Sequence, residues 1–265
     1  MGLRGFTRKI GILKDYNANF QCGQCHNAAN RYLTYKWLKD DKPVRPEDLQ
    51  KAGVSPYATE FFKDPLESWA WFKAKGWHQG VNGTTGVHYV NGSDHPHVEI
   101  MLQSKHGQAG VTCTDCHFAR KADGKAEHQA SLVKLKVENT CMRSACHGPG
   151  SKSNWTDPGQ ALYTIEAIQQ EYRIRVQKME MAAKDAQRIF MKLKAGEASL
   201  PQEVKEKLET AYEKYLSARD WYLTDLSSGF HDPEGFNRTV SVVTWELRKT
   251  NAAAQGALKK TPVKQ

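Results

Sequence analysis

The chain has 265 residues, and 38 lysines and arginines against 29 aspartates and glutamates give it a formal charge of +9. Its 7 Trp, 10 Tyr and 9 Phe exclude a disordered chain. No stretch approaches the roughly 20 apolar residues that span a bilayer, and residues 1–19 lack the apolar core of a signal peptide. The basic excess is typical of nucleic-acid binding, but the lysines are scattered and no recognition motif accompanies them, so we expect no nucleic-acid partner.

The six cysteines form three pairs, and in each pair the second cysteine is followed directly by histidine. Chance would give only about 0.005 C-x-x-C-H strings at this composition, and the chain has two. In such a string two thiols add to the vinyl groups of one haem, and the adjacent histidine binds the iron. We therefore expect three haem c groups, the third on a variant with two extra spacer residues. The motifs are Cys22-Gly-Gln-Cys25-His26, Cys113-Thr-Asp-Cys116-His117 and Cys141-Met-Arg-Ser-Ala-Cys146-His147, with His26, His117 and His147 as proximal ligands.

Three other uses of paired cysteines fit less well. Disulfides give no reason for the histidines, and a zinc site recruits two neighbouring pairs, whereas the first pair here is far from the second. A thioredoxin-like dithiol needs one pair and no following histidine. Because haem c is attached outside the bacterial cytoplasmic membrane, we expect a periplasmic or extracellular protein.

The expected fold is mostly α, with a loop-rich haem-binding region at 1–156 followed by long helices at 157–257 and a basic tail at 258–265. Apolar residues at helical spacing predict helices over 161–194, 201–226 and 236–257. These helices cover the haem region or mediate self-association. Aromatic side chains in the first region can pack on haem faces, and the alternative is ordinary protein packing; they include Trp37, Trp69, Trp71 and Trp77.

Haem iron with two histidine ligands needs a distal histidine as well as the proximal one. Seven histidines remain for this role: His78, His88, His95, His97, His106, His128 and His231. His106 lies on a polar segment shortly before Cys113, His128 follows the second motif, and His231 lies at a break between two long helices. These three are our candidates for distal ligands, whereas His78 and His88 are read as ordinary histidines.

The order of these motifs, together with Asp94-His95-Pro96, the segment from His106 to His117 and Phe230-His-Asp-Pro-Glu-Gly235, resembles the C-terminal half of pentahaem, ammonia-forming cytochrome c nitrite reductase. Octahaem nitrite reductases and hydroxylamine oxidoreductases share that core. The resemblance makes His231 the distal ligand of the haem on Cys113/Cys116, and His106 that of the haem on Cys141/Cys146. It makes His128 a ligand of a haem attached earlier in the chain, and His95 the catalytic-pocket histidine.

Several parts of the family pattern are missing: the lysine-ligated haem motif, the second haem motif, the pocket arginine and the N-terminal segment that supplies the first haem here with its distal ligand. The Glu-Tyr pair that serves calcium is replaced by Asn27-Ala-Ala-Asn-Arg31, so the resemblance gives little support for calcium. We expect a fragment, a subunit or a divergent electron-transfer relative of such an enzyme, with a missing N-terminal half or a further haem-bearing subunit as its complement.

Two functions follow from these observations. The first is electron transfer through bis-histidine haems, with a redox partner cytochrome or a quinol-oxidising membrane cytochrome as donor. The second is catalysis on nitrite, hydroxylamine or a similar small nitrogen or sulfur compound, with His95, His97 and Lys105 as an acid-base and cationic pocket. The relatives assemble through their long helices, so the resemblance also implies a homo-oligomer.

Overall fold

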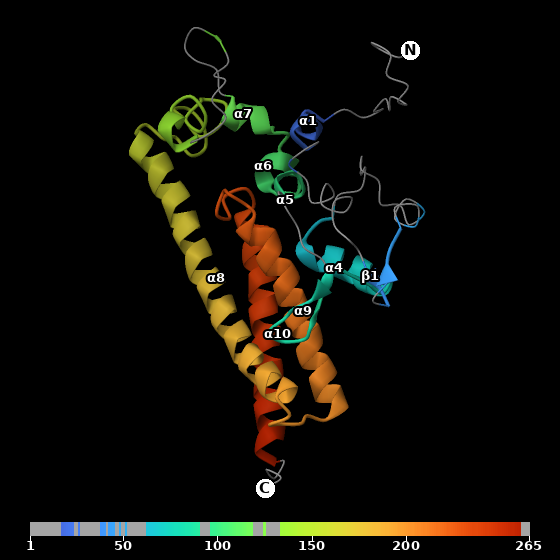
Figure 1. Ribbon diagram of the computed structural model, residues 1–265. Helices are drawn as coiled ribbons and strands as arrows, with labels where there is room; N and C mark the ends of the chain where they lie inside the picture. The colour runs from blue at the N-terminus through green and yellow to red at the C-terminus, as the bar shows by residue number, and fades with distance from the viewer. Residues whose placement is uncertain are drawn as a thin grey trace.

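Three long helices dominate the chain, so the mostly α fold expected from the sequence is confirmed (Figure 1). They are α8 (Pro158–Lys194), α9 (Gln202–Leu223) and α10 (Pro233–Lys260). The computed structural model describes residues 17–23, 26, 38–40, 42–45, 48, 51, 62–90, 96–118, 124–125 and 133–260. Within these residues no helix is both long enough and apolar enough to cross a bilayer.

The ends of the long helices follow local capping rules. The Asp157 side chain accepts a hydrogen bond from the Gly159 amide at the start of α8, and Gly196, at φ +73°, follows its last turn. α9 begins directly after Pro201 and ends three residues before the predicted limit. α10 is longer than the predicted 236–257, because it begins at Pro233 and continues into the expected basic tail.

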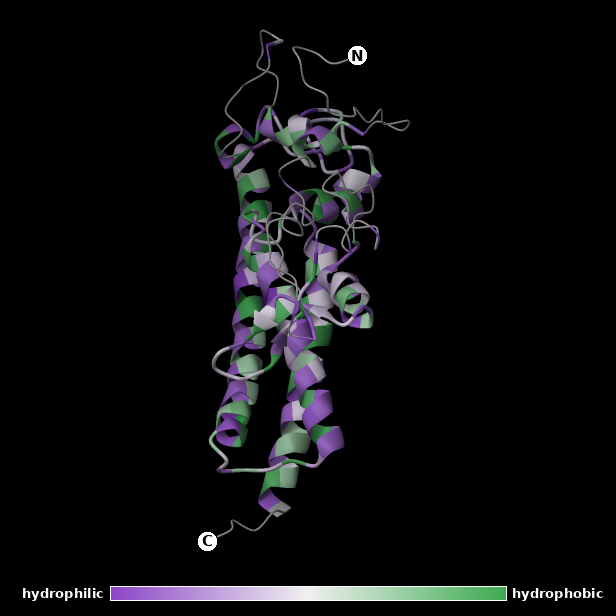
Figure 2. Cartoon of the chain, turned by 45° about the vertical axis from the view of Figure 1, so that its right-hand side comes forward, coloured by the Kyte–Doolittle hydropathy of each residue, from purple (hydrophilic) through white to green (hydrophobic). Residues whose placement is uncertain are grey.

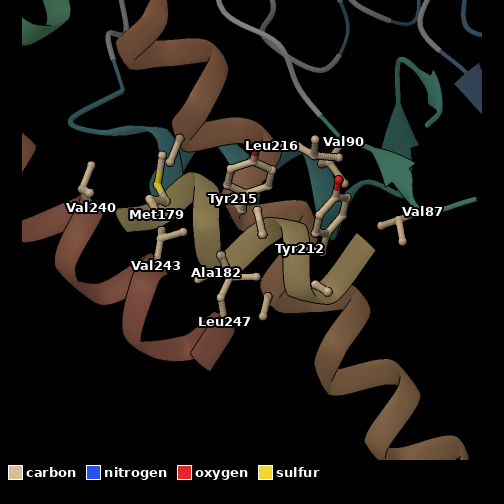
Figure 3. Packing of buried hydrophobic residues seen from close by; sticks show 14 of the residues in the cluster. Val87, Val90, Met179, Ala182, Tyr212, Tyr215, Leu216, Val240, Val243 and Leu247 are labelled. Carbon is tan, nitrogen blue, oxygen red and sulfur yellow. The ribbon is translucent and has the colours of Figure 1, made fainter. Parts of the chain in front are cut away.

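The core of the helical part is built around α10, which packs along both α8 and α9. On α8 the facing residues are small, with Ala182, Ala183 and Ala186 all buried, so the helix backbones can approach closely. Val243 and Leu247 of α10 are fully buried against them (Figure 3). Hydrophilic and hydrophobic residues alternate around the long helices, as expected when each helix buries one face (Figure 2).

The small amount of strand lies beside α4 (Pro65–Ala74), which packs on α9. Antiparallel pairing joins β1 (Leu38–Lys39) to both β2 (Lys42–Pro43) and β3 (Trp77–His78). A second antiparallel pair is formed by β4 (Gly80–Val81) and β5 (His88–Tyr89). The loop between them and the residue after β5 contribute buried Val87 and Val90 to the helical core (Figure 3).

Three of the tryptophans considered for haem packing make ordinary protein contacts in this part of the chain. Trp71 and Trp77 lie edge to face with their ring centroids 6.0 Å apart. The Trp69 indole N–H donates to Glu213 on α9. Trp37 lies outside the described residues.

The short helices gather at one end of the long-helix bundle, where α8 begins and α9 turns into α10 (Figure 1). All three cysteine motifs therefore lie beside the turn that carries His231. These elements are α1 (Asn19–Gly23), α5 (His97–Gln103), α6 (Lys105–Gln108), α7 (Cys113–His117) and the 3-10 helix η2 (Val133–Lys136).

Candidate functional site

The second motif is itself a short helix, α7, and its first turn is fixed by two neighbours. Thr112 and Asp115 form a capping box, in which the Thr112 amide donates to Asp115 Oδ2 at 2.8 Å. The Cys113 amide donates to Asn19 Oδ1 at 2.7 Å. Since Asn19 is buried in α1, next to the first motif, this hydrogen bond ties the first two motifs together.

The cysteines of successive motifs are neighbours in space. Burial, followed by the adjacent Cys22 thiol, raises the pKa of the Cys113 thiol to about 12. Burial, followed by the nearby Cys141, raises the pKa of Cys116 to about 11. The motifs are thus arranged in chain order, and no disulfide joins the five described cysteines, whereas Cys25 lies outside the described residues.

The third motif has two extra residues between its cysteines, yet it keeps the backbone hydrogen bond between its histidine and its first cysteine. In the first motif the His26 amide donates to the carbonyl oxygen of Cys22 at 2.9 Å. In the third motif the His147 amide donates to the carbonyl oxygen of Cys141 at 3.0 Å. The longer spacer therefore closes a wider backbone ring, but with the same hydrogen bond from the histidine amide to the carbonyl of the first cysteine.

Two pairs of histidines face each other at the separation that a shared metal requires. When two imidazoles bind one metal from opposite sides, metal–nitrogen bonds of about 2 Å place the ring centroids about 6 Å apart. The centroids of His117 and His231 are 6.3 Å apart, and those of His106 and His147 are 6.0 Å apart. The residues present therefore fit bis-histidine haem iron at both places, with the partners that the family resemblance implies.

The turn between α9 and α10 holds His231 in place. Its Nδ1 lies 2.9 Å from Oδ1 of Asp225, whose side chain is completely buried. Burial alone would raise the pKa of Asp225, but the hydrogen bonds and charge of His231 and the hydroxyl of Ser227 hold this pKa below its usual value. Asp225 is thus a carboxylate in direct contact with the His231 ring.

His106 and His147 are fixed by different means. His106 follows the Ser104 cap of α6, where Ser104 Oγ accepts from the Gly107 amide, and a side chain at Gly107 would meet the carbonyl oxygen of Met101. Burial, followed by the His147 charge, lowers the pKa of His106, so its neutral, metal-binding form is favoured. His147 stacks on Trp155 and lies 2.9 Å from Ser153 Oγ through Nδ1.

His26 of the first motif has a different neighbour, His97, at a centroid distance of 5.2 Å. The Val98 amide donates to the His26 carbonyl oxygen at 3.1 Å, which places the backbones of His26 and His97 side by side. Two ligands on opposite faces of a porphyrin need backbones much farther apart. His97 therefore lies on the same side as His26 and does not face it across an iron.

Some of the sequence-predicted residues fall elsewhere. His95 and His128 lie outside the described residues, as do residues 27–31, where the calcium site of the resembled family would lie. Lys105, considered for a cationic pocket, forms an ion pair with Glu234. His78 and His88 stack on each other at 4.4 Å, away from the cysteine motifs.

Sequence reasoning missed the contact of Asp225 with His231. It also missed the position of His97 between His26 and His231. Asp225-Leu-Ser227 before Gly229 is a turn signal, because aspartate and serine bond to nearby amides, but it does not reveal which histidine the carboxylate will meet. His97 carries no local signal at all.

Comparison with known proteins decides the family. The family model for cytochrome c552 matches residues 17–265. The chain belongs to the cytochrome c552 family. It is a multihaem cytochrome related to cytochrome c nitrite reductase, and membership of this family implies haem c as its cofactor.

Individual members of the cytochrome c552 family and their relatives match only in part. Cytochrome c-552 of Bacteroides thetaiotaomicron is 28% identical over 138 residues, covering 48% of this chain and 22% of that protein. The cytochrome c nitrite reductase subunit NrfA of Nitratidesulfovibrio vulgaris is 23% identical over 223 residues, covering 80% of this chain and 40% of that protein. This chain thus spans less than half the length of these relatives.

The fold has a counterpart among solved structures. The catalytic subunit of cytochrome c nitrite reductase from Desulfovibrio desulfuricans, a structure with two calcium sites, superposes with a TM-score of 0.62 at 18% identity. The superposition covers 91% of this chain and 48% of that one. The arrangement of short helices at the end of a long-helix bundle is therefore the fold of that enzyme's corresponding part.

Proposed function

We propose that this chain carries electrons through three c-type haems, at least two of them ligated by histidine on both faces. Bound haem c supplies reversible one-electron transfer at its iron. The observation that carries the proposal is the pair of histidine separations, 6.3 Å for His117 and His231 and 6.0 Å for His106 and His147. With an imidazole on each side, these positions leave no room for a substrate.

The adjacency of the motifs supports the same function. Cys22 lies beside Cys113, and Cys116 lies beside Cys141 and Cys146, so the attachment points follow each other in space as they do in sequence. Electrons pass readily between redox centres in contact, so an ordered row suits a conduit. His26, His117 and His147 serve as the proximal ligands in this proposal.

The setting follows from the cofactor. Because haem c is attached outside the cytoplasmic membrane, we place the chain in the periplasm or outside the cell. Its donor is a redox partner cytochrome or a quinol-oxidising membrane cytochrome. Its long helices α8 and α10 provide the surface for a homo-oligomer.

A second candidate is reduction of nitrite, hydroxylamine or a similar small compound, favoured by the relatedness to cytochrome c nitrite reductase. This activity needs one iron with an open face, supplied by a further haem-bearing segment or subunit. His95 would donate protons in such a pocket, and His128 would bind a haem carried by that segment or subunit. Lys105 is held by Glu234, so it fits that pocket poorly.

The haem number tests the proposal directly. A pyridine haemochrome assay should give three haems per chain, and replacing both Cys141 and Cys146 by serine should lower this to two. The corresponding double replacement of Cys113 and Cys116 is the control for a standard motif. Two haems in the unaltered chain would contradict the assignment of the third motif.

Axial ligation is tested by electron paramagnetic resonance. His231→Ala should convert one low-spin haem to high spin, with His88→Ala, a change outside the motif cluster, as the matched control. An unchanged low-spin spectrum in His231→Ala would remove His231 from the ligands. Because no distal ligand is assigned to the haem on Cys22/Cys25, one high-spin haem in the unaltered chain fits the proposal, and a second would contradict it.

A further inference from the structure

The turn between α9 and α10 surrounds one buried carboxylate with hydrogen-bond donors. Asp225 Oδ1 accepts from the Ser227 amide at 3.1 Å and lies 2.9 Å from His231 Nδ1. Asp225 Oδ2 accepts from the Ser227 hydroxyl at 2.6 Å and from the Gly229 amide at 3.2 Å. The Ser227 hydroxyl oxygen in turn accepts from the His231 amide at 3.0 Å. Backbone and side chain of His231 are therefore held by the same small network.

This network determines which nitrogen of His231 is available. An ionised carboxylate can only accept hydrogen bonds, so the Nδ1 atom that faces Asp225 must carry the proton. The other ring nitrogen, Nε2, then keeps its lone pair and can bind a metal. A carboxylate behind a ligating histidine also makes the imidazole a stronger electron donor.

The same carboxylate has a second histidine beside it. His97 Nε2 lies 4.0 Å from Asp225 Oδ1, and the His97 ring centroid is 5.6 Å from that of His231. His97 also lies 5.2 Å from His26, the proximal histidine of the first motif, on the same side of that site. Asp225 and His97 together thus fill the space between the first motif and His231.

We propose that Asp225 is a positioning residue that fixes the tautomer and orientation of His231, with His97 packed between this carboxylate and His26. The proposal rests on the function proposed above, in which His231 is an axial ligand. The buried negative charge stabilises the ferric form of the haem at Cys113/Cys116 over the ferrous form. The network therefore keeps the reduction potential of that haem below the value it would have with an unsupported histidine.

The test is Asp225→Asn in the haem-loaded chain, followed by spectroscopic redox titration. Asparagine keeps the shape and can still accept from His231, but it removes the charge. We expect one of the haem midpoint potentials to move to a more positive value while the others stay in place. Asp225→Ala should in addition add a high-spin signal, because His231 loses its support.

Glu213→Gln is the matched control. Glu213 is also a buried carboxylate with two side-chain donors, Trp69 and Lys73, but it lies on α9 away from the histidines. It should lower the stability of the chain and leave all haem potentials unchanged. If Glu213→Gln moved the potentials as much as Asp225→Asn, the effect would be structural and the proposal would be overturned.

Ser227→Ala keeps the proposal testable if Asp225→Asn does not fold. It removes the hydroxyl that donates to Asp225 and accepts from the His231 amide, so it should shift the midpoint potential of the same haem and leave the others in place. If the haems at Cys113/Cys116 and Cys141/Cys146 are low-spin and neither variant moves a midpoint potential, the role of Asp225 is overturned while the ligation stands. A chain with no bis-histidine haem overturns the proposed ligation instead.

Discussion

The imidazole planes of His106 and His147 lie at 89° to each other, with the ring centroids 6.0 Å apart. Axial imidazoles that are close to perpendicular give a strongly anisotropic low-spin signal in electron paramagnetic resonance. We expect one such signal from this chain, and His106→Ala should abolish it while adding a high-spin signal. A variant that kept the anisotropic signal would show that another residue is the distal ligand at the third motif.

Gly229 gives a prediction about the turn that carries His231. Its φ is +82°, and a side chain there would lie 2.7 Å from Cδ2 of Tyr172. Gly196 has a similar φ of +73° but open space around it. In denaturant unfolding, Gly196→Ala should cost about 1–2 kcal/mol through backbone strain alone. Gly229→Ala should cost clearly more, and equal losses would mean that Tyr172 yields without penalty.

The core around α10 predicts a large difference between two leucines. Leu247 is fully buried between the long helices, whereas Leu226 is 80% exposed in the turn after α9. Leu247→Ala should lower the free energy of unfolding by about 2–5 kcal/mol, since it leaves a cavity. Leu226→Ala should change it by less than about 0.5 kcal/mol. Equilibrium unfolding of both variants checks the packing, and similar values would contradict the burial of Leu247.

The outer face of α10 predicts how the chain associates. Trp245 is 61% exposed, Val242 is 41% exposed one turn earlier, and Lys249 covers part of the Trp245 ring. If this face lies in a homo-oligomer, Trp245→Glu should reduce the mass measured by light scattering to that of one chain. Val81→Glu, at a similarly exposed site in β4 and outside the long helices, is the control. A monomeric unaltered chain would contradict the expected oligomer.

Much of the fold and the motif positions could be predicted because they depend on local chemistry. Apolar residues at helical spacing indicated the long helices, and only their ends differed, as in α10, where Pro233 starts the helix earlier. The pairing of His117 with His231 and of His106 with His147 came from resemblance to a family, and the structure brings both pairs to metal-binding distance.

The remaining features depend on contacts between segments distant in sequence, which periodicity and spacing do not encode. The Lys105–Glu234 ion pair joins α6 to α10, and the Trp69–Glu213 hydrogen bond joins α4 to α9. The proximity of His97 to His26 comes with a backbone hydrogen bond from the Val98 amide to the His26 carbonyl oxygen. None of these contacts has a signature in the residues on either side of it.

The backbone ring closed by the His147 amide and the Cys141 carbonyl has a consequence for recognising such motifs in other chains. A pattern that fixes two residues between the cysteines would find two motifs here and overlook the third, in which the histidine amide also donates to the carbonyl of the first cysteine. The geometry to look for is a hydrogen bond from the backbone amide of the histidine to the carbonyl oxygen of the first cysteine, whatever the number of residues between them. On that criterion the spacer length is a variable of the motif, and the hydrogen bond that closes the loop is its constant feature.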